Sequence, residues 1–222
     1  KLTIEHRLES KPLDWPHCAG RWMTTTGALL LAAGKSRRFG GDKRAARLPS
    51  GTTVAAETLH HLSAAFDAVH VVLRENDSDA FIESLTIEAP NAGFSRCQDA
   101  HLGMGHSLAH GVAQVVNWDC LAVCLADMPF IQARTYRQLI EAFKAEASSG
   151  AILVPTYQSK RGHPVLFGSE HFPAMQLLQG DEGAKTLLEA QANNVHFVEI
   201  NDAAILRDID QPTDLLSTAK GD

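Results

Sequence analysis

The chain has 222 residues, of which 45% are hydrophobic, and its formal net charge at pH 7 is -6. This length suits one large α/β domain with a real hydrophobic core. The acidic balance argues against a general nucleic-acid binder, although it leaves room for a local basic pocket that holds a phosphorylated small molecule. No apolar run approaches the ~20 residues that cross a bilayer, so no membrane contact is expected.

The N-terminal segment differs from the rest of the chain. Residues 1–22 lack the apolar core of a signal peptide, and they precede Met23, which has the character of a natural start. We therefore expect an N-terminal extension over residues 1–22 that is not part of the fold, and a single domain over residues 23–222.

The cysteines bear on the cellular compartment. The sequence contains four of them and no CxxC pair: Cys18, Cys97, Cys120 and Cys124. Cys120 and Cys124 have a spacing that a zinc site can use, but they lie in an apolar run with no second ligand pair nearby. We interpret the cysteines as reduced core residues, which predicts a cytoplasmic protein.

Strands and helices are expected to alternate along the chain. In order, we expect a strand over 28–32, a glycine-containing loop to about residue 50, a helix over 53–66, a strand over 68–73, a helix over 77–85, a polar loop over 91–105, a helix over 107–116 and a strand over 120–126. There follow a helix over 135–147, strands over 151–154 and 165–167, a helix over 183–191, a strand over 195–200 and a short terminal helix opened by residues 208–214.

This alternation predicts an α/β fold with three layers, in which helices cover both faces of a mostly parallel sheet. In such sheets, ligands bind at the carboxyl ends of the strands. The loop after the first strand is rich in glycine and cations. Its glycines allow a tight turn with exposed N–H groups that make a nest for an anion, and Arg38 and Lys43 can reach the same anion. A plain turn with solvated charges is the alternative; the spacing fits neither GxGxxG nor GxxxxGK[ST].

Carboxylates stand at two further strand or segment ends. Asp127 directly follows the apolar strand over 120–126, where a carboxylate can hold Mg²⁺ together with substrate phosphates. Capping of the next helix is the alternative. Asp208 and Asp210 alternate in an extended segment and can point to the same side. A helix cap is the alternative there also, and it fits Asp214 better.

Two other segments have residues suited to contact a ligand. Gly103, Gly105 and Ser107 permit close backbone approach to a flat ring, with Ser107 as the N-cap of the next helix as an equal interpretation. Gly162 and His163 lie between two strands, where a simple surface turn is equally expected.

The segment LAAGKSRRFGGDK, which ends at Lys43, resembles the LAAGxSxR[MF]GxxK signature of nucleotidyltransferases that act on the molybdenum cofactor, and is most similar to the molybdenum cofactor cytidylyltransferases. The resemblance covers roughly residues 28–217. It implies a Rossmann-like nucleotidyltransferase fold. It also implies a nucleotide site in which the loop wraps a triphosphate. Arg38 and Lys43 would neutralise the negative charges of that triphosphate. By resemblance the nucleotide-binding residues are Ala32, Ala33, Gly34, Ser36, Arg38, Lys43, Gly103, Ser107 and Asp127.

The remaining roles are also implied by this resemblance. Asp127 matches the family's metal-binding aspartate, and the segment DIDQPTD resembles a DIDTPxD segment whose acidic residue completes the metal site, with Gln in place of Thr. Either Asp208 or Asp210 would be that residue, next to a Mg²⁺ ion. Gly103 and Ser107 would contact cytosine, and Gly162 and His163 the acceptor. Arg38, Lys43 and Asp127 would be the catalytic residues.

The implied reaction is transfer of CMP from CTP to the phosphate of molybdopterin, with release of pyrophosphate. CTP and the molybdenum cofactor would be the substrates, and a molybdoenzyme would receive the product. The AAG form of the first motif goes with CTP in this family, and AGG with GTP. The alternatives are nucleotidyl transfer to a sugar or isoprenoid-precursor phosphate, an NAD(P)H-dependent oxidoreductase, and a non-catalytic carrier of the cofactor.

Overall fold

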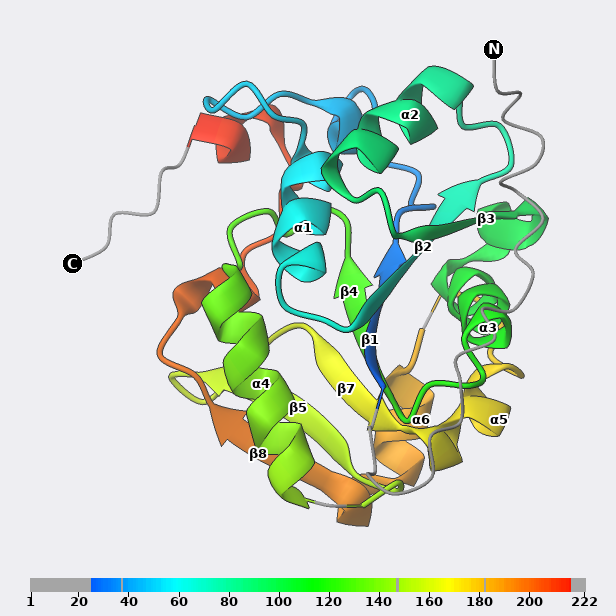
Figure 1. Cartoon of the computed structure of the whole chain (residues 1–222), viewed down its shortest axis with the longest axis vertical. Coiled ribbons are helices and arrows are strands. Elements are labelled where there is room, and N and C mark those ends of the chain that lie inside the picture. The colour runs from blue at the N-terminus through cyan, green and yellow to red at the C-terminus, as the bar shows by residue number, and fades with distance from the viewer. Residues whose placement is uncertain (1–24, 37, 147, 182, 217–222) are drawn as a thin grey trace.

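The computed structural model describes residues 25–36, 38–146, 148–181 and 183–216. The expected extension over residues 1–22 and Cys18 lie outside these ranges. The described strands form one eight-stranded sheet in the order β3-β2-β1-β4-β7-β5-β6, with β8 paired to β5 (Figure 1). The strands are β1 (Thr26–Leu31), β2 (Ala68–Arg74), β3 (Gly93–Cys97), β4 (Cys120–Leu125), β5 (Ile152–Tyr157), β6 (Lys160–Arg161), β7 (Val165–Gly168) and β8 (Val195–Glu199).

The sheet is mixed, with a parallel half that carries the first loop. β1 pairs in parallel with β2 and β4, and β2 pairs in parallel with β3. β7 runs antiparallel to β4 and β5, whereas β8 is parallel to β5. Leu31 at the end of β1 pairs with Val72 on one side and Leu125 on the other. The carboxyl ends of β1 and β4 therefore meet at one edge of the sheet.

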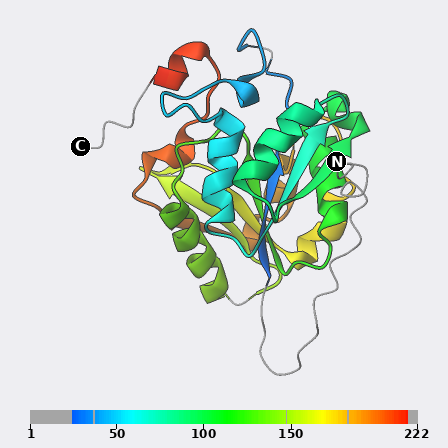
Figure 2. The same ribbon diagram turned by 45° about the horizontal axis from the view of Figure 1, so that its top comes forward.

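Helices cover both faces of the sheet, so the predicted three-layer α/β fold is confirmed (Figures 1 and 2). The helices are α1 (Val54–Ser63), α2 (Asp79–Glu88), α3 (Met104–Gln114), α4 (Ala133–Glu146), α5 (Phe172–Met175) and α6 (Lys185–Ala190). Alternate residues of β1 face opposite sides: Leu30 packs with residues of α1, α2 and α4, and Leu29 with residues of α3, α5 and α6. This double burial explains why β1 reads as a continuous apolar run.

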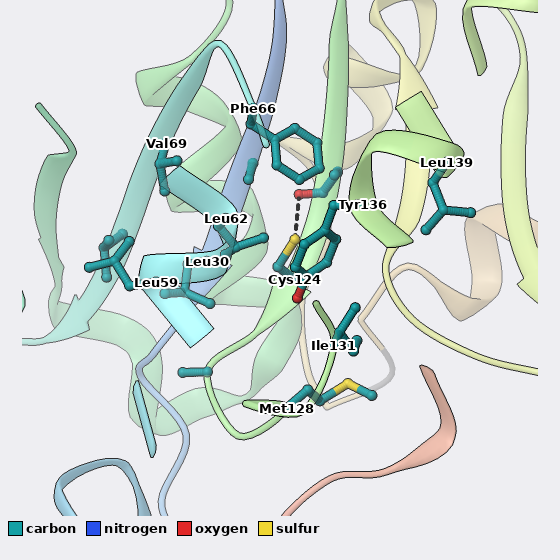
Figure 3. Packing of buried hydrophobic residues seen from close by; sticks show 14 of the residues in the cluster. Leu30, Leu59, Leu62, Phe66, Val69, Cys124, Met128, Ile131, Tyr136 and Leu139 are labelled. Atoms are coloured by element: carbon teal, nitrogen blue, oxygen red, sulfur yellow. Dashed lines mark hydrogen bonds between the residues drawn. The ribbon is translucent and has the colours of Figure 1, made fainter. Parts of the chain in front are cut away.

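The larger core cluster lies under α1, α2 and α4. Figure 3 shows side chains from β1, α1 and α4 meeting there, among them Leu30, Leu62 and Tyr136. The rings of Phe66 and Tyr136 lie 5.7 Å apart between centroids, within the range of favourable aromatic pairs. Cys124 is buried in the same cluster and is a free thiol, like the other two described cysteines. Burial raises the pKa of the Cys124 thiol, as expected for an unreactive core residue.

The structure corrects three expectations. Residues 93–97 were expected within a polar loop but form the edge strand β3, whose half-exposed position removes the need for an apolar run. α3 begins at Met104 rather than at residue 107, so Ser107 lies inside the helix and is not its N-cap. Phe172–Met175 forms a short helix that the sequence pattern did not indicate.

The C-terminal segment packs against the loop that follows β1. Ile209 is fully buried with Leu48 and Val54, and its N–H donates to the backbone carbonyl of Asp127 over 2.9 Å. The two views of the fold show this segment beside the early loop at the top edge of the sheet (Figures 1 and 2). Asp214 Oδ2 accepts hydrogen bonds from the N–H groups of Asp210 and Gln211, which confirms Asp214 as the capping residue of the terminal turn.

One pH effect on stability follows from His70, which lies in β2 with 6% exposure and has Nε2 2.9 Å from Oγ of Ser95. Burial, and then the charge of His110, lowers the pKa of His70 to about 4. The unfolded chain therefore binds more protons below about pH 6.5, so the free energy of unfolding should fall by about 3 kcal/mol between pH 6.5 and 4 from this residue. Urea unfolding at several pH values should show a flatter dependence for His70→Gln; equal slopes would contradict the assignment.

Candidate functional site

A cavity of about 410 Å³ opens at the carboxyl edge of β1 and β4. Most of the residues predicted to bind nucleotide or metal lie in its wall. They are Ala32, Ala33, Gly34, Ser36, Arg38, Lys43, Gly103, Ser107, Asp127 and Asp210. Asp208, Gly162 and His163 are not part of this wall. The cavity thus gathers five separate stretches of sequence around one space.

The charged end of the cavity is built around Lys43. Its Nζ lies 2.6 Å from Oδ2 of Asp127 and 3.2 Å from Oδ1 of Asp210. Nη1 of Arg38 donates to Oδ2 of Asp210 over 3.0 Å. The side chains of Lys43 and Asp127 are 14% and 17% exposed, whereas that of Arg38 is 80% exposed. We call these four residues the Lys43 cluster.

The pKa values of the site reflect these contacts. Burial lowers the pKa of Lys43, but its hydrogen bonds and attraction to Asp127 and Asp210 more than offset this, so the pKa lies above its ordinary value. The hydrogen bond from Lys43 holds the pKa of Asp210 below its usual range. Partial burial, and then the like charges of Asp127 and Asp210, raise the pKa of Asp208. Asp208 therefore lies close to the cluster although it does not line the cavity.

A divalent metal fits the carboxylates of this cluster. Oδ1 of Asp127 is buried and has no hydrogen-bond partner among the described residues, so it offers a free, oriented oxygen ligand. Within the same residues no group of three or more His, Cys, Asp or Glu side chains is arranged to hold a metal ion.

The backbone of the loop is held from behind by two arginines that the sequence reasoning missed. Arg44 is buried, donates to the carbonyl of Ala32, and forms hydrogen bonds with Asp77 (Nη1–Oδ2, 2.7 Å) and Asp42 (Nε–Oδ1, 2.9 Å). Arg74 donates to the carbonyl of Gly34 and, over 3.2 Å, to Asp42. These bonds fix the path of the chain from residue 32 to residue 34. The supporting role of Arg44 is recognised from its burial, which the sequence alone does not show.

The far end of the cavity is formed by the start of α3 and a segment before α6. Gly103 has φ +136°, and a Cβ there would lie 2.3 Å from the carbonyl oxygen of Gly180 and 2.7 Å from Oδ1 of Asp181. The N–H of Gly105 donates to the same carbonyl over 2.7 Å. Asp181, which also lines the cavity, was not predicted. Its signal in the sequence is the glycine pair of the segment GDEG.

The predicted acceptor residues lie beside the cavity. A Cβ on Gly162 would lie 2.6 Å from the carbonyl oxygen of Ile205, and the N–H of His163 donates to that oxygen over 2.9 Å. Gly162 is therefore required by packing, whatever else it contacts. Burial lowers the pKa of His163, while the nearby charges of Asp127 and Asp208 act in the opposite direction. His163 thus lies near Asp127 and Asp208, the carboxylates predicted to bind metal, and its Nδ1 has no partner in the described chain.

Fold and site together define a nucleotide-binding α/β protein, with a cationic loop after the first strand and acidic residues at a neighbouring strand end. The chain belongs to the family described as the MobA-like NTP transferase domain, whose model matches residues 28–195. It is therefore a nucleotidyltransferase, as its first motif predicts. In the described residues no helix combines the length and the apolar character needed to span a membrane.

Individual relatives extend this comparison. The chain is 32% identical to the purine catabolism protein PucB of Bacillus subtilis over 197 residues, which are 83% of this chain and 91% of PucB. Rv0371c of Mycobacterium tuberculosis superposes with a TM-score of 0.69 at 24% identity over 86% of this chain and 95% of Rv0371c. Another structure of Rv0371c is a complex with manganese (TM-score 0.63, 22% identity, 80% of this chain and 88% of that chain).

Molybdopterin-guanine dinucleotide biosynthesis protein A of Archaeoglobus fulgidus has a TM-score of 0.60 at 18% identity, over 86% of this chain and 95% of that protein. At this identity the likeness establishes a shared fold.

The support given by Arg44 can be tested by substitution. Arg44→Met should lower the free energy of unfolding by about 3 kcal/mol or more, because it leaves the carboxylates of Asp42 and Asp77 without their buried partner. Arg47→Met is the matched control, since Arg47 is exposed and its guanidinium donates to the carbonyl of Gly51. It should cost less than about 1 kcal/mol. Equal losses in urea unfolding of the two variants would contradict the role given to Arg44.

Proposed function

We propose that this nucleotidyltransferase moves CMP from CTP to the terminal phosphate of molybdopterin and releases pyrophosphate. The observation that carries the proposal is the single cavity in which the LAAG loop, Lys43, Asp127 and Asp210 share a wall with Gly103 and Ser107. One end supplies charge for a triphosphate, and the other supplies close backbone approach for a base. We also propose that residues 23–222 constitute one such domain.

The chemistry asks little of the protein beyond placement and charge. A phosphate nucleophile is already ionised at neutral pH, so it attacks the α-phosphorus without a general base, and pyrophosphate leaves in line. Lys43 and Arg38 would neutralise the charge that develops on the β- and γ-phosphates. Arg38 is mostly exposed and can follow the leaving group, whereas Lys43 starts from a partly buried position beside Asp127.

Asp127 and Asp210 would hold Mg²⁺. When bound, the ion supplies charge neutralisation at the α-phosphate and orients the reacting oxygens. Asp210 is favoured over Asp208 as the second ligand, because it shares Lys43 with Asp127 and lines the cavity. The manganese complex of Rv0371c supports the use of a divalent metal on this fold.

The base and the acceptor are assigned from neighbouring residues. Ala33 gives the AAG form of the motif that goes with CTP, and Gly103 and Ser107 would lie against cytosine. The acceptor would lie by Gly162 and His163, because His163 is close to Asp127 and Asp208 without lining the cavity itself. A molybdoenzyme would then receive the product. The buried free thiols of the core suit a cytoplasmic setting.

The family assignment favours nucleotidyl transfer over the oxidoreductase alternative, and the intact Lys43 cluster favours an enzyme over a carrier. A sugar phosphate or isoprenoid-precursor phosphate remains the alternative acceptor, since the same charged end would serve any phosphate nucleophile. GTP is the alternative nucleotide, because the named function of the Archaeoglobus fulgidus protein concerns guanine.

The proposal is tested by measuring pyrophosphate release with Mg²⁺ and each of CTP, GTP, UTP and ATP, with and without the molybdenum cofactor. We expect release with CTP, and only when the cofactor is present. Release with GTP would keep the chemistry and overturn the base assignment. A requirement for a sugar or isoprenoid-precursor phosphate would overturn the acceptor, and no release with any pair would contradict the proposed reaction.

Substitution of the cluster tests the individual roles. Lys43→Ala should lower kcat by about 10²–10³, the usual loss for one transition-state charge contact, and Asp127→Ala should abolish turnover. Lys144→Ala, on the outer face of α4 beside Glu141, is a control that should leave kcat unchanged. Near-normal kcat in either cluster variant, with a normal melting temperature, would remove that residue from the mechanism.

A further inference from the structure

The Lys43 cluster already contains a cation between the two carboxylates assigned to the metal. The ammonium of Lys43 contacts one oxygen of Asp127 and one of Asp210 at 2.6 and 3.2 Å. Arg38 takes the second oxygen of Asp210 at 3.0 Å. Of the four carboxylate oxygens, Oδ1 of Asp127 alone has no partner among the described residues.

A free divalent ion meets two obstacles at such a site. It finds one open carboxylate oxygen, whereas hard cations need several oxygen ligands. It must also approach a fixed positive charge in a partly buried region, where repulsion is screened less than in water. Lys43 is 14% exposed, so solvent does little to reduce this repulsion.

The backbone that carries the two carboxylates is held by other parts of the chain. The carbonyl of Asp127 accepts from the N–H of Ile209, and the N–H of Asp210 donates to Asp214, so the backbone at both residues is bound in place. Arg38 has a mostly exposed side chain, and both Arg38 and Lys43 face the cavity. A triphosphate in the cavity offers both cations new anionic partners without moving the carboxylates.

We propose that Lys43 is an internal counter-cation that makes metal binding depend on the nucleotide. The inference rests on the proposed function, in that it takes the cavity to bind a nucleotide triphosphate with a divalent metal. Drawing Lys43 and Arg38 onto the phosphates frees three carboxylate oxygens, and the metal then binds to these and to the phosphates. By linkage, metal binding strengthens nucleotide binding by the same factor.

The test measures Mn²⁺ binding to the full chain by calorimetry or electron paramagnetic resonance, with no nucleotide and no acceptor. We expect weak binding to the wild-type protein and binding at least about tenfold tighter to Lys43→Met, because the variant keeps the apolar stem and removes the charge. Lys35→Met is the matched control. Lys35 lines the same cavity but donates to the carbonyl of His101, so its loss should leave Mn²⁺ affinity near that of the wild type.

Adding Asp127→Asn to Lys43→Met should remove the gain, which locates the ion at the cluster. Lys43→Gln serves as a second neutral variant if Lys43→Met has a lowered melting temperature. Unchanged affinity in both neutral variants, or an equal gain in Lys35→Met, would overturn the proposal. The Mn²⁺ measurement needs no turnover, so it is independent of the reaction. Tighter Mn²⁺ binding to Lys43→Met without cytidylyl transfer by the wild-type protein would support this inference and contradict the proposed reaction. Cytidylyl transfer with unchanged Mn²⁺ binding in the neutral variants would support the reaction and contradict this inference.

Discussion

The structure of the site depends on bringing one ammonium group, that of Lys43, to two carboxylates that lie 84 and 167 positions further along the chain. Lys43 follows β1, Asp127 lies two residues after the end of β4, and Asp210 lies in the C-terminal segment. β1 and β4 are parallel neighbours, so the first two meet at one edge of the sheet. Burial of Ile209 against the loop brings the third. Without Lys43, the two acidic residues would repel each other in a partly buried region.

Two neighbouring residues show how the same kind of charge serves two purposes. Arg44 also borders the cavity, but its side chain is 3% exposed and its guanidinium donates to two carboxylates and a backbone carbonyl, so it fixes the loop. Lys43, one position earlier, lines the same cavity and pairs with Asp127 and Asp210, which it would exchange for phosphates under the proposed mechanism. The Arg44 network thus holds the backbone of the loop that leads to the Lys43 cluster. Such support from behind is what keeps a phosphate-binding loop preorganised.

Much of this arrangement can be predicted from the sequence, and the elements and contacts that the sequence did not predict were missed for physical reasons. The strands predicted over 28–32 and 120–126 are covered on both faces, so their sequences are continuous apolar runs that are easy to recognise. The motif from Leu31 to Lys43 predicts the family. Strand β3 was not predicted because an edge strand buries little apolar surface and so needs no apolar run. The start of α3 was predicted three residues too late because its N-cap is Gly103, which has a positive φ and no side chain that would mark a cap in the sequence. Asp181 and the Arg44 network were not predicted because they depend on contacts between distant segments, and the hydrophobic pattern of a sequence carries no information about such contacts.

The central claim is that Lys43 leaves the carboxylates when nucleotide and metal bind. A crystal structure of the protein with Mn²⁺ and a non-hydrolysable CTP analogue tests it most directly, through the anomalous signal of the metal. The account predicts a metal peak within about 2.5 Å of Asp127 and Asp210, with Nζ of Lys43 on the phosphates and more than 4 Å from both carboxylates. A metal bound elsewhere, or Lys43 still bridging Asp127 and Asp210 beside a bound nucleotide, would contradict it.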